Sequence, residues 1–489
     1  MNTPVRRIAL AVMAMVLLLM ANLTYVQVVK ASDYRNDDRN QRVLFAEYSR
    51  KRGQISADGQ VLANSVESND ALRYQRRYPD GPTYATVTGY YSVIYGATGI
   101  EDAADEALNG SDDRLFVRRL SDLITGRDPS GGNVELTINP AMQKEAYQAL
   151  TNRGFAGSVV ALRPETGEIL AMVSTPSFDP NPLSSHGAEE QTAARTRFIA
   201  AEPEVVTNRA ISQIYPPGST FKLVDTAAAL QNGLTPDTQL TAAANITLTG
   251  TNTTLENFAG TRCGTAPTVS LRDALARSCN AAFAELAATL GEAKLREQAE
   301  AFGIGSVDLS VPMRVVPSTL GEIEDTAALQ QSGIGQRDVA LTPLQNAMIV
   351  AAIANGGQLM APYLIEQIQN PELDPVDVTK PDRIGQAVSS EVARTLTELM
   401  IGSENRTSGG GKITGVQIAS KTGTAEHGTD PKNTPPHNWY VAFAPVEDPK
   451  IAVAVLVENG GDRSLEATGG SRAAPIGRAV IAAGLRGAS

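Results

Sequence analysis

Three short motifs carry side chains that together could transfer an acyl group. Ser219 and Lys222 form S-x-x-K, Ser278 and Asn280 form S-x-N, and residues 421–423 read K-T-G. A serine hydroxyl is a weak nucleophile that needs a base within hydrogen-bond reach, and an uncharged lysine amine can be that base. Each motif alone arises often by chance, so the prediction of a nucleophilic serine rests on all three in this order.

The first motif lies where a turn gives way to a helix. Residues 216–218 read Pro-Pro-Gly, and the apolar run at 223–230 predicts a buried helix that begins at Ser219. Positions i and i+3 share a helix face, so Ser219 and Lys222 are expected side by side. Burial lowers the pKa of an amine, which would leave Lys222 a neutral base. Taken alone, the pattern more often marks an ordinary buried helix with one lysine that reaches solvent.

The second motif falls between two predicted helices. Ser270 begins a capping pattern for a helix that runs to about Arg277, and a second apolar run follows Asn280. Ser278 and Asn280 would then lie in a tight connection that opens on a cleft. The Ser278 hydroxyl could relay a proton between Lys222 and the leaving amine, and the Asn280 amide could hold Lys222 and the substrate backbone. A simple capping turn is the alternative.

The third motif ends a short predicted strand that begins at residue 416. Gly423 within a strand indicates close approach by another backbone or a ligand. A substrate peptide paired with this edge would gain main-chain hydrogen bonds.

Neighbouring groups on this strand suggest three further roles. An oxyanion could lie between the backbone N–H groups of Ser219 and Thr424. Lys421 would supply positive charge, and Thr422 would supply a hydroxyl for a terminal carboxylate. A plain turn at a strand end is the alternative for this motif, and it is hard to reconcile with the other two motifs.

With these motifs the chain resembles the class B penicillin-binding proteins, monofunctional D,D-transpeptidases of peptidoglycan synthesis. Within that class it is most similar to the actinobacterial penicillin-binding protein A branch, over nearly the whole chain. Outside the three motifs the resemblance is carried by residues 208–210 (N-R-A), 215–218 (Y-P-P-G), 335–336 (G-Q), 341–345 (L-T-P-L-Q), 354–357 (A-N-G-G), 424–426 (T-A-E) and 439–440 (W-Y).

The resemblance implies an α+β fold, a penicillin-binding and β-lactamase-like transpeptidase domain with helices packed on a five-stranded antiparallel sheet. A transmembrane helix and an elongated N-terminal pedestal domain would precede it. The residue pattern predicts the strands at 157–162, 169–174, 416–425, 438–444 and 451–457, and a closing helix at 473–485. Residues 241–261 are expected to form an insertion loop, residues 409–411 (G-G-G) a mobile loop, and Trp439 to lie in the sheet core or the cleft.

Three segments are expected along the chain. Residues 1–31 would be a cytoplasmic tip and transmembrane signal anchor, residues 32–132 a non-catalytic pedestal for dimerisation or partners, and residues 133–489 the transpeptidase domain. Residues 128–132 read as a linker. Two short strands are expected on either side of an Asp-Gly turn at Asp58. The family that the chain resembles usually has asparagine at this position of its signature.

The N-terminus predicts a membrane location. Arg6 and Arg7 precede residues 8–29, which carry no charge and are long enough to span a bilayer with the N-terminus in the cytoplasm. A signal peptide cleaved near residues 29–31 is the alternative, although the run is long for one. The catalytic part would then face the cell wall.

Composition excludes several other classes of function. The 489 residues carry a net charge of −11 without basic blocks, which argues against nucleic-acid binding. The three histidines lack metal-ligand spacing, so no metal site is expected. No phosphate-binding loop or dinucleotide fingerprint is present, and no cofactor is expected.

The chain has two cysteines, Cys263 and Cys279. An even number in an extracytoplasmic domain favours a disulfide, which would tie the insertion loop to the second motif. Two buried free thiols are the alternative.

The activity that the resemblance implies is cross-linking of peptidoglycan stems. Ser219 would attack the carbonyl between the two terminal D-alanines, D-Ala would leave, and an amine of a neighbouring stem would resolve the acyl-enzyme. β-Lactams would acylate the same serine. The alternatives are a carboxypeptidase or β-lactamase, although no E-x-x-L-N follows Ser278, and a non-catalytic divisome scaffold or β-lactam sensor.

The expected partners follow from the same resemblance. Peptidoglycan stem peptides ending in D-Ala-D-Ala and β-lactams would bind the site. Because no glycosyltransferase domain is apparent, a polytopic membrane glycosyltransferase and other division proteins are expected to act with the chain in division or cell shape.

Overall fold

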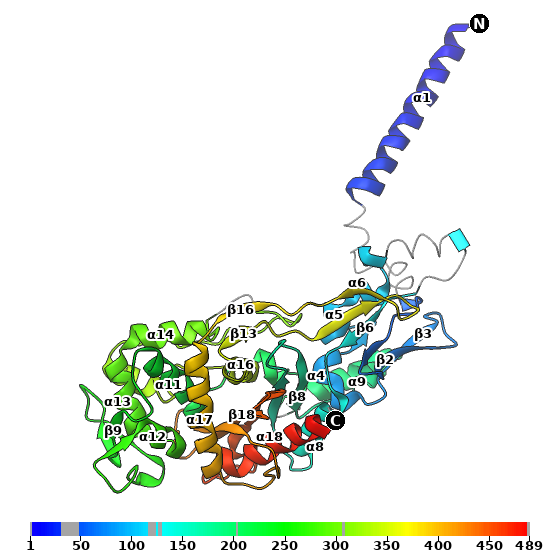
Figure 1. Ribbon diagram of the computed structural model, residues 1–489. Helices are drawn as coiled ribbons and strands as arrows, with labels where there is room; N and C mark the ends of the chain where they lie inside the picture. Colours follow the sequence, from blue (N-terminus) through cyan, green and yellow to red (C-terminus); the bar gives the residue numbers. More distant parts are fainter. Residues whose placement is uncertain are drawn as a thin grey trace.

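A computed structural model describes residues 2–30, 48–115, 124–125, 130–201, 204–305 and 309–486. Its N-terminal helix, α1 (Asn2–Thr24), continues into a π-helical turn, η1 (Tyr25–Val29). The stretch Thr3–Val29 is long and apolar enough to cross a membrane (Figure 1). Parts of the predicted pedestal and of its linker at 128–132 lie outside the described residues.

A six-stranded sheet with the order β15-β14-β6-β1-β2-β3 forms the pedestal. β1 pairs in parallel with β6, and its antiparallel turn to β2 has positive φ at Asp58 and Gly59, as the Asp-Gly signal predicts. The strands are β1 (Ile55–Ala57), β2 (Gln60–Glu67), β3 (Tyr74–Arg77), β6 (Asn133–Leu136), β14 (Ile365–Gln369) and β15 (Pro375–Val378). Three strands, β6, β14 and β15, therefore come from the predicted transpeptidase domain, so the sheet crosses the predicted boundary at residue 133, which stays a prediction.

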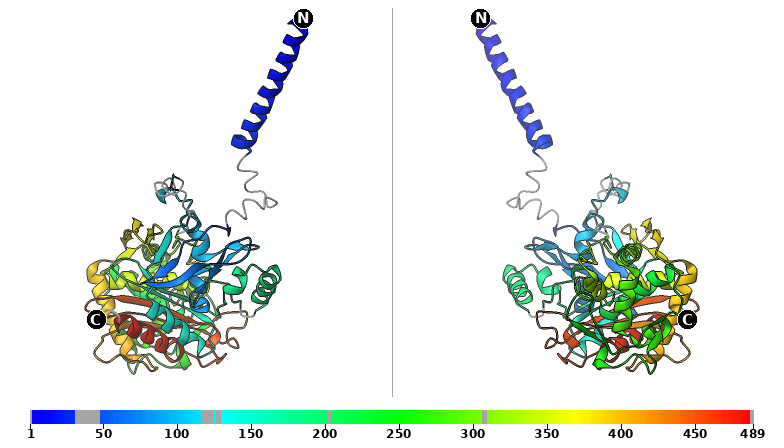
Figure 2. Two further views of the ribbon diagram at one scale, coloured as in Figure 1. Left: turned by 90° about the vertical axis from the view of Figure 1, so that its right-hand side faces the viewer. Right: turned by 90° about the vertical axis from the view of Figure 1, so that its left-hand side faces the viewer.

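Figures 1 and 2 show the blue pedestal strands and the yellow β14–β15 segment at the same end of the molecule. The small elements around this sheet are α4 (Gly81–Thr88), β4 (Tyr91–Ser92), β5 (Gly96–Ala97), α5 (Gly99–Ala103), α6 (Asp105–Asn109) and η2 (Asp113–Leu115). The buried carboxylate of Glu101, on α5, pairs with Arg52 at 2.7 Å and with Arg76 of β3 at 2.5 Å. The two guanidinium groups offset the cost of burying this charge.

The second sheet has five antiparallel strands in the order β17-β18-β19-β7-β8, as expected. They are β7 (Gly157–Leu162), β8 (Ile169–Thr175), β17 (Ala419–Ala425), β18 (His437–Ala444) and β19 (Ile451–Val457). α8 (Pro140–Thr151) and α18 (Gly469–Arg486) cover one face, and α16 (Pro343–Ala354) covers the other. Apolar side chains on the two faces belong to two separate cores, which is why β7, β8, β18 and β19 are buried along their whole length.

A helical lobe lies beside β17, at the end of the sheet. It contains η4 (Gly218–Thr220), α11 (Lys222–Gln231), α12 (Leu271–Arg277), α13 (Asn280–Leu290), α14 (Glu292–Ala301), α15 (Thr326–Ser332) and α17 (Ser390–Arg406). The remaining elements are η3 (Asn181–Ser184), α9 (Ala188–Ile199), α10 (Arg209–Ser212), β13 (Gln358–Met360), β16 (Arg383–Gln386) and η6 (Glu458–Gly460). Figure 1 shows α11, α12, α13 and α14 grouped at the end opposite the pedestal.

The structure corrects three local expectations. The predicted strand at residue 416 begins at Ala419, and the closing helix begins at Gly469, four residues earlier than expected. The insertion is not a plain loop, because it holds β10 (Asn245–Thr247), β11 (Thr254–Glu256) and η5 (Phe258–Gly260), and the paired strands β9 (Gln239–Thr241) and β12 (Thr268–Ser270) flank it. Three-residue polar strands lack the alternation that marks a strand in sequence. In the triple-glycine loop, Arg478 donates to the carbonyls of Gly409 and Gly410 at 2.9 and 3.0 Å, and the mobility expected of this loop stays a prediction.

Candidate active site

Ser219 lies on a tight turn, η4, that is held between two other backbones. The backbone N–H of Gly218 donates to the Gly335 carbonyl at 2.9 Å. Gly218 has a φ of 52°, and a Cβ there would lie 2.8 Å from the Thr424 carbonyl. Glycine is needed at this position both for its backbone conformation and for space. The turn leaves the Ser219 side chain partly exposed between buried neighbours.

The α-helix starts at Lys222 and not at Ser219 as predicted. Ser219 lies in the 3-10 turn Gly218–Thr220, which precedes Phe221 and the start of the α-helix. The expected placement of the Ser219 and Lys222 side chains next to each other stays a prediction.

The Lys222 amine is enclosed by the second motif. Nζ donates to the backbone carbonyl of Ser278 at 2.9 Å and to Asn280 Oδ1 at 2.7 Å, and it lies 3.4 Å from Ser278 Oγ. The side chain is fully buried. Burial, and after it the charge of Lys421, hold the pKa of Lys222 well below its ordinary value, while Asp225 acts in the opposite direction. The amine is thereby suited to accept a proton.

Ser278 is the residue at which two lysines meet. It has a φ of 62° between α12 and α13, a left-handed conformation that non-glycine residues rarely adopt. Its Oγ accepts from Lys421 Nζ at 2.9 Å and faces Lys222 Nζ at 3.4 Å. Because a hydroxyl can donate and accept, Ser278 is placed to pass a proton between groups on either side.

The third motif lies within β17, which pairs with β18 on one side in the described sheet. Lys421 Nζ donates to Ser278 Oγ and to the Thr422 carbonyl, both at 2.9 Å. Burial lowers the pKa of Lys421 to about 7. Thr422 and Thr424 are half-buried, and their predicted contact with a substrate peptide stays a prediction.

Gly423 is indeed a point of close approach. A Cβ there would lie 2.7 Å from the Pro217 carbonyl and 3.1 Å from the side chain of Thr220. The approaching backbone is thus the turn that carries the nucleophile. Contact between β17 and this turn brings the first and third motifs together.

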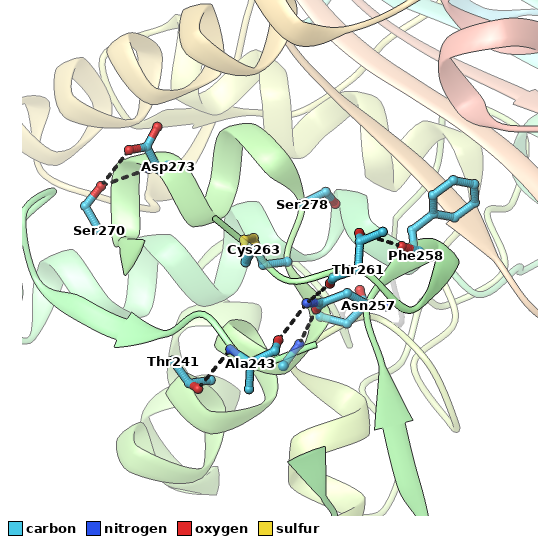
Figure 3. The surroundings of a disulfide bond; sticks show 12 residues. Thr241, Ala243, Asn257, Phe258, Thr261, Cys263, Ser270, Asp273 and Ser278 are labelled. Atoms are coloured by element: carbon cyan, nitrogen blue, oxygen red, sulfur yellow. Dashed lines mark hydrogen bonds between the residues drawn. A yellow bond between two sulfur atoms is a disulfide. The ribbon is translucent and has the colours of Figure 1, made fainter. Parts of the chain in front are cut away.

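The insertion clamps the second motif from outside (Figure 3). The side chain of Asn257 accepts from the Ala281 backbone N–H at 2.9 Å and donates to the carbonyls of Ala243 and Thr261 at 2.8 and 2.9 Å. The Asn280 side chain donates to the Glu256 carbonyl at 2.9 Å. These bonds fix the start of α13, where Asn280 contacts Lys222.

A disulfide adds a covalent link to this clamp. Cys263 and Cys279 are bonded, with Cα atoms 5.9 Å apart, and both side chains are buried. Cys279 lies between the two motif residues Ser278 and Asn280, so the insertion is tied directly to the second motif.

Sequence reasoning missed the residues that support the nucleophile turn. Asn346 of α16 is buried and donates to Thr220 Oγ1 at 3.0 Å, and that hydroxyl donates to the Pro217 carbonyl at 2.9 Å. Trp439, buried in the sheet, donates from Nε1 to the Pro216 carbonyl at 3.0 Å. The polar pair Gln345 and Asn346 at the start of an otherwise apolar helix was the available signal. Among the described residues, no group of three or more His, Cys, Asp and Glu could hold a metal ion.

Comparisons with known proteins agree with this geometry. Residues 157–482 match the penicillin-binding protein transpeptidase domain, and residues 52–134 match the penicillin-binding protein A dimerisation domain. The chain is 57% identical to the peptidoglycan D,D-transpeptidase PbpA of Mycolicibacterium smegmatis, over 99% of both chains. It is 55% identical to PbpA of Mycobacterium tuberculosis H37Rv, over 100% of both.

Solved structures point the same way. Penicillin-binding protein A of M. tuberculosis in its ceftriaxone acyl-enzyme complex superposes with a TM-score of 0.89 at 55% identity, over 90% of this chain and 100% of that one. The penicillin G acyl-enzyme complex of the same protein gives a TM-score of 0.86, over 89% of this chain and 100% of that one. The chain therefore belongs to the class B penicillin-binding proteins, in the branch of the penicillin-binding protein A type peptidoglycan D,D-transpeptidases.

Proposed function

We propose that this chain cross-links peptidoglycan stems through an acyl-enzyme on Ser219. The observation that carries the proposal is the placement of Ser278 Oγ between two buried lysines, 2.9 Å from Lys421 Nζ and 3.4 Å from Lys222 Nζ. Such a chain of groups can move one proton from the nucleophile to a leaving amine.

The acylation step follows from these contacts. The Ser219 O–H bond breaks, its proton forms a new N–H bond on the Lys222 amine, and the oxygen attacks the carbonyl between the two terminal D-alanines. Backbone N–H groups of Ser219 and Thr424 receive the oxyanion. When the tetrahedral intermediate collapses, Ser278 gives its hydroxyl proton to the departing amine of D-Ala and takes the proton held by Lys222, so the Lys222 amine is neutral again and the ester on Ser219 remains.

The second half of the reaction reverses this path. An amine of a neighbouring stem attacks the ester, loses a proton through Ser278 and Lys222, and Ser219 recovers its hydroxyl. Lys421 and Thr422 bind the terminal carboxylate of the acyl donor, or that of a β-lactam. Gly423 allows β17 to lie against the nucleophile turn, and the edge of β17 pairs with the stem peptide.

A hydrolase would use the same first step and deliver water to the ester. The 57% identity to a D,D-transpeptidase over 99% of both chains favours cross-linking. A non-catalytic scaffold is disfavoured because all three motifs are assembled in contact.

We also propose the cellular setting. The span at Thr3–Val29 anchors the protein in the membrane, and the basic Arg6 and Arg7 hold its N-terminus in the cytoplasm. The catalytic part then lies outside the cell, where peptidoglycan is. The pedestal would contact a polytopic membrane glycosyltransferase and other division proteins, which supply the glycan strands to be cross-linked.

The test is covalent labelling by fluorescent penicillin with intact-protein mass spectrometry. Ser219→Ala should lose the adduct and keep its fold, whereas the control Ser212→Ala, at the exposed end of α10, should label normally. A penicilloyl adduct on the Ser219→Ala protein would refute the assignment of the nucleophile. Muropeptide analysis after depletion then separates the activities: fewer cross-links support a transpeptidase, and longer stems with unchanged cross-links support a carboxypeptidase.

A further inference from the structure

The turn that carries Ser219 has few hydrogen-bond donors in its own backbone. Pro216 and Pro217 have no N–H group, so neither can donate a bond that would hold the turn. Their carbonyls are bound by side chains. Trp439 Nε1 donates to the Pro216 carbonyl at 3.0 Å. Thr220 Oγ1 donates to the Pro217 carbonyl at 2.9 Å. The shape of the turn therefore depends on side chains that the three motifs do not specify.

A second side chain decides where the Thr220 hydroxyl points. Thr220 is buried, and its Oγ1 accepts from Asn346 Nδ2 at 3.0 Å. A hydroxyl has one proton to give, and the NH2 group of an amide can only donate. With that donor on one side, the Thr220 proton is directed to the Pro217 carbonyl on the other. Asn346, on α16, is therefore the far end of a two-step link to the turn.

The link ends at the groups that are proposed to react. A Cβ on Gly218 would lie 2.8 Å from the Thr424 carbonyl oxygen, so that carbonyl faces the turn. In a β-strand the N–H and C=O of one residue point to the same side, and the Thr424 N–H faces the turn as well. Among the described residues, the backbone N–H of Ser219 has no acceptor. The spacing of the two N–H groups proposed for the oxyanion is thus set by how the turn is held against β17.

We infer that Asn346 is a positioning residue for acylation, which acts through Thr220 on the turn that presents the hydroxyl and N–H of Ser219. An apolar side chain would fill the place of Asn346 in the core without needing a hydrogen-bond partner, so packing alone does not account for an amide there. Asn346 does not touch the substrate, and no bond to it forms or breaks. The inference rests on the proposed function of Ser219.

The same helix offers a matched control at the preceding position. Gln345 is buried to the same degree as Asn346, 2% exposed against 1%. Its Nε2 donates to the carbonyl of Phe302, at the end of α14, at 2.8 Å. Each amide therefore satisfies a buried acceptor, but only Asn346 bonds to the nucleophile turn. Replacing either residue by leucine removes one such bond, and both variants should melt at a lower temperature than the wild type.

The test is stopped-flow acylation by penicillin G, measured on the full chain over a range of concentrations. This separates the acylation rate constant from the dissociation constant of the complex that precedes it. Asn346→Leu should lower the rate constant about 10-fold and leave the dissociation constant within about twofold, because the turn shifts while the β17 edge stays in place. Gln345→Leu should keep the wild-type value of both constants.

Variants at Thr220 test the same link from the turn itself, and they carry the test if Asn346→Leu does not fold. Thr220→Val removes the hydroxyl and should slow acylation by a similar factor. Thr220→Ser keeps the hydroxyl and should acylate several-fold faster than Thr220→Val. The double variant of Asn346→Leu and Thr220→Val should be no slower than the slower single variant, because both changes break one link.

Three outcomes would each overturn the inference: a wild-type acylation rate constant in Thr220→Val, an equal fall in Gln345→Leu and Asn346→Leu, or effects that multiply in the double variant. Failure of the proposed function looks different, because the wild-type protein would then form no penicilloyl adduct on Ser219.

Discussion

Replacing Asn257 by alanine should damage catalysis more than its distance from the nucleophile suggests. The change removes three hydrogen bonds at once, to the Ala281 N–H and to the carbonyls of Ala243 and Thr261. At about 1 kcal/mol net for each bond, the loss in unfolding free energy is about 3 kcal/mol. Ala281 is fully buried, so its N–H would be left without solvent as a substitute partner.

The catalytic effect of Asn257→Ala follows from what the clamp holds. Ala281 follows Asn280, whose Oδ1 accepts from Lys222 Nζ at 2.7 Å. A shift of about 1 Å in a catalytic group can cost a hundredfold in rate, so acylation should slow by roughly 10- to 100-fold. Stopped-flow acylation by a fluorescent penicillin measures this rate, at a temperature where urea denaturation shows the variant to be folded.

The matched control for Asn257→Ala is Thr251→Ala, at the tip of the same insertion. Thr251 Oγ1 donates to the Leu248 carbonyl at 2.9 Å and accepts from the Thr253 N–H at 3.0 Å, so it makes hydrogen bonds within the hairpin and none to the second motif. It should acylate at the wild-type rate. The reasoning is refuted if folded Asn257→Ala acylates normally, or if Thr251→Ala is slowed to the same degree.

Three further predictions concern the lysines and the disulfide. Lys222→Arg should abolish acylation, because a guanidinium stays protonated and cannot serve as a base; near-normal labelling by mass spectrometry would place the base elsewhere. Lys421 has a pKa of about 7 and loses its charge as the pH rises through that value, so acylation should decline on the basic side. In any acylation that Lys421→Arg retains, the decline in rate at high pH should be absent. A decline that persists in this variant would exclude Lys421 as the cause of the decline. Reducing the bond between Cys263 and Cys279 should slow acylation before the domain unfolds. The expected loss in unfolding free energy is around 3 kcal/mol, the contribution of closing a loop of about 15 residues. Alkylation of two thiols in the denatured, unreduced protein would contradict the bridge.

Much of the fold was predictable because local signals agreed with it. The hairpin of β7 and β8 has strong apolar strands around a Pro-Glu-Thr-Gly turn, β19 is apolar throughout, and β18 is apolar from Trp439 onward. The Ser270 cap was predictable for the same reason, since its side chain accepts from the Asp273 N–H.

What sequence could not predict depends on contacts between distant segments. The pairing of β6 with β14 joins residues more than two hundred positions apart, and no local pattern encodes it. Asn346 supports the nucleophile turn from another helix. The order of the motifs indicated their chemistry, whereas the insertion that clamps Ser278 and Asn280 became visible only in three dimensions.

The sheet shared by β1, β6 and β14 has a consequence for how this protein can be divided and how it unfolds. β6 lies between β1 of the pedestal and β14 of the catalytic part, so removing residues before 133 would strip one whole side of β6 of its backbone partners. An exposed strand edge of that kind invites pairing with other chains. Such a fragment should therefore aggregate, and the intact pedestal and catalytic part should melt in a single cooperative transition.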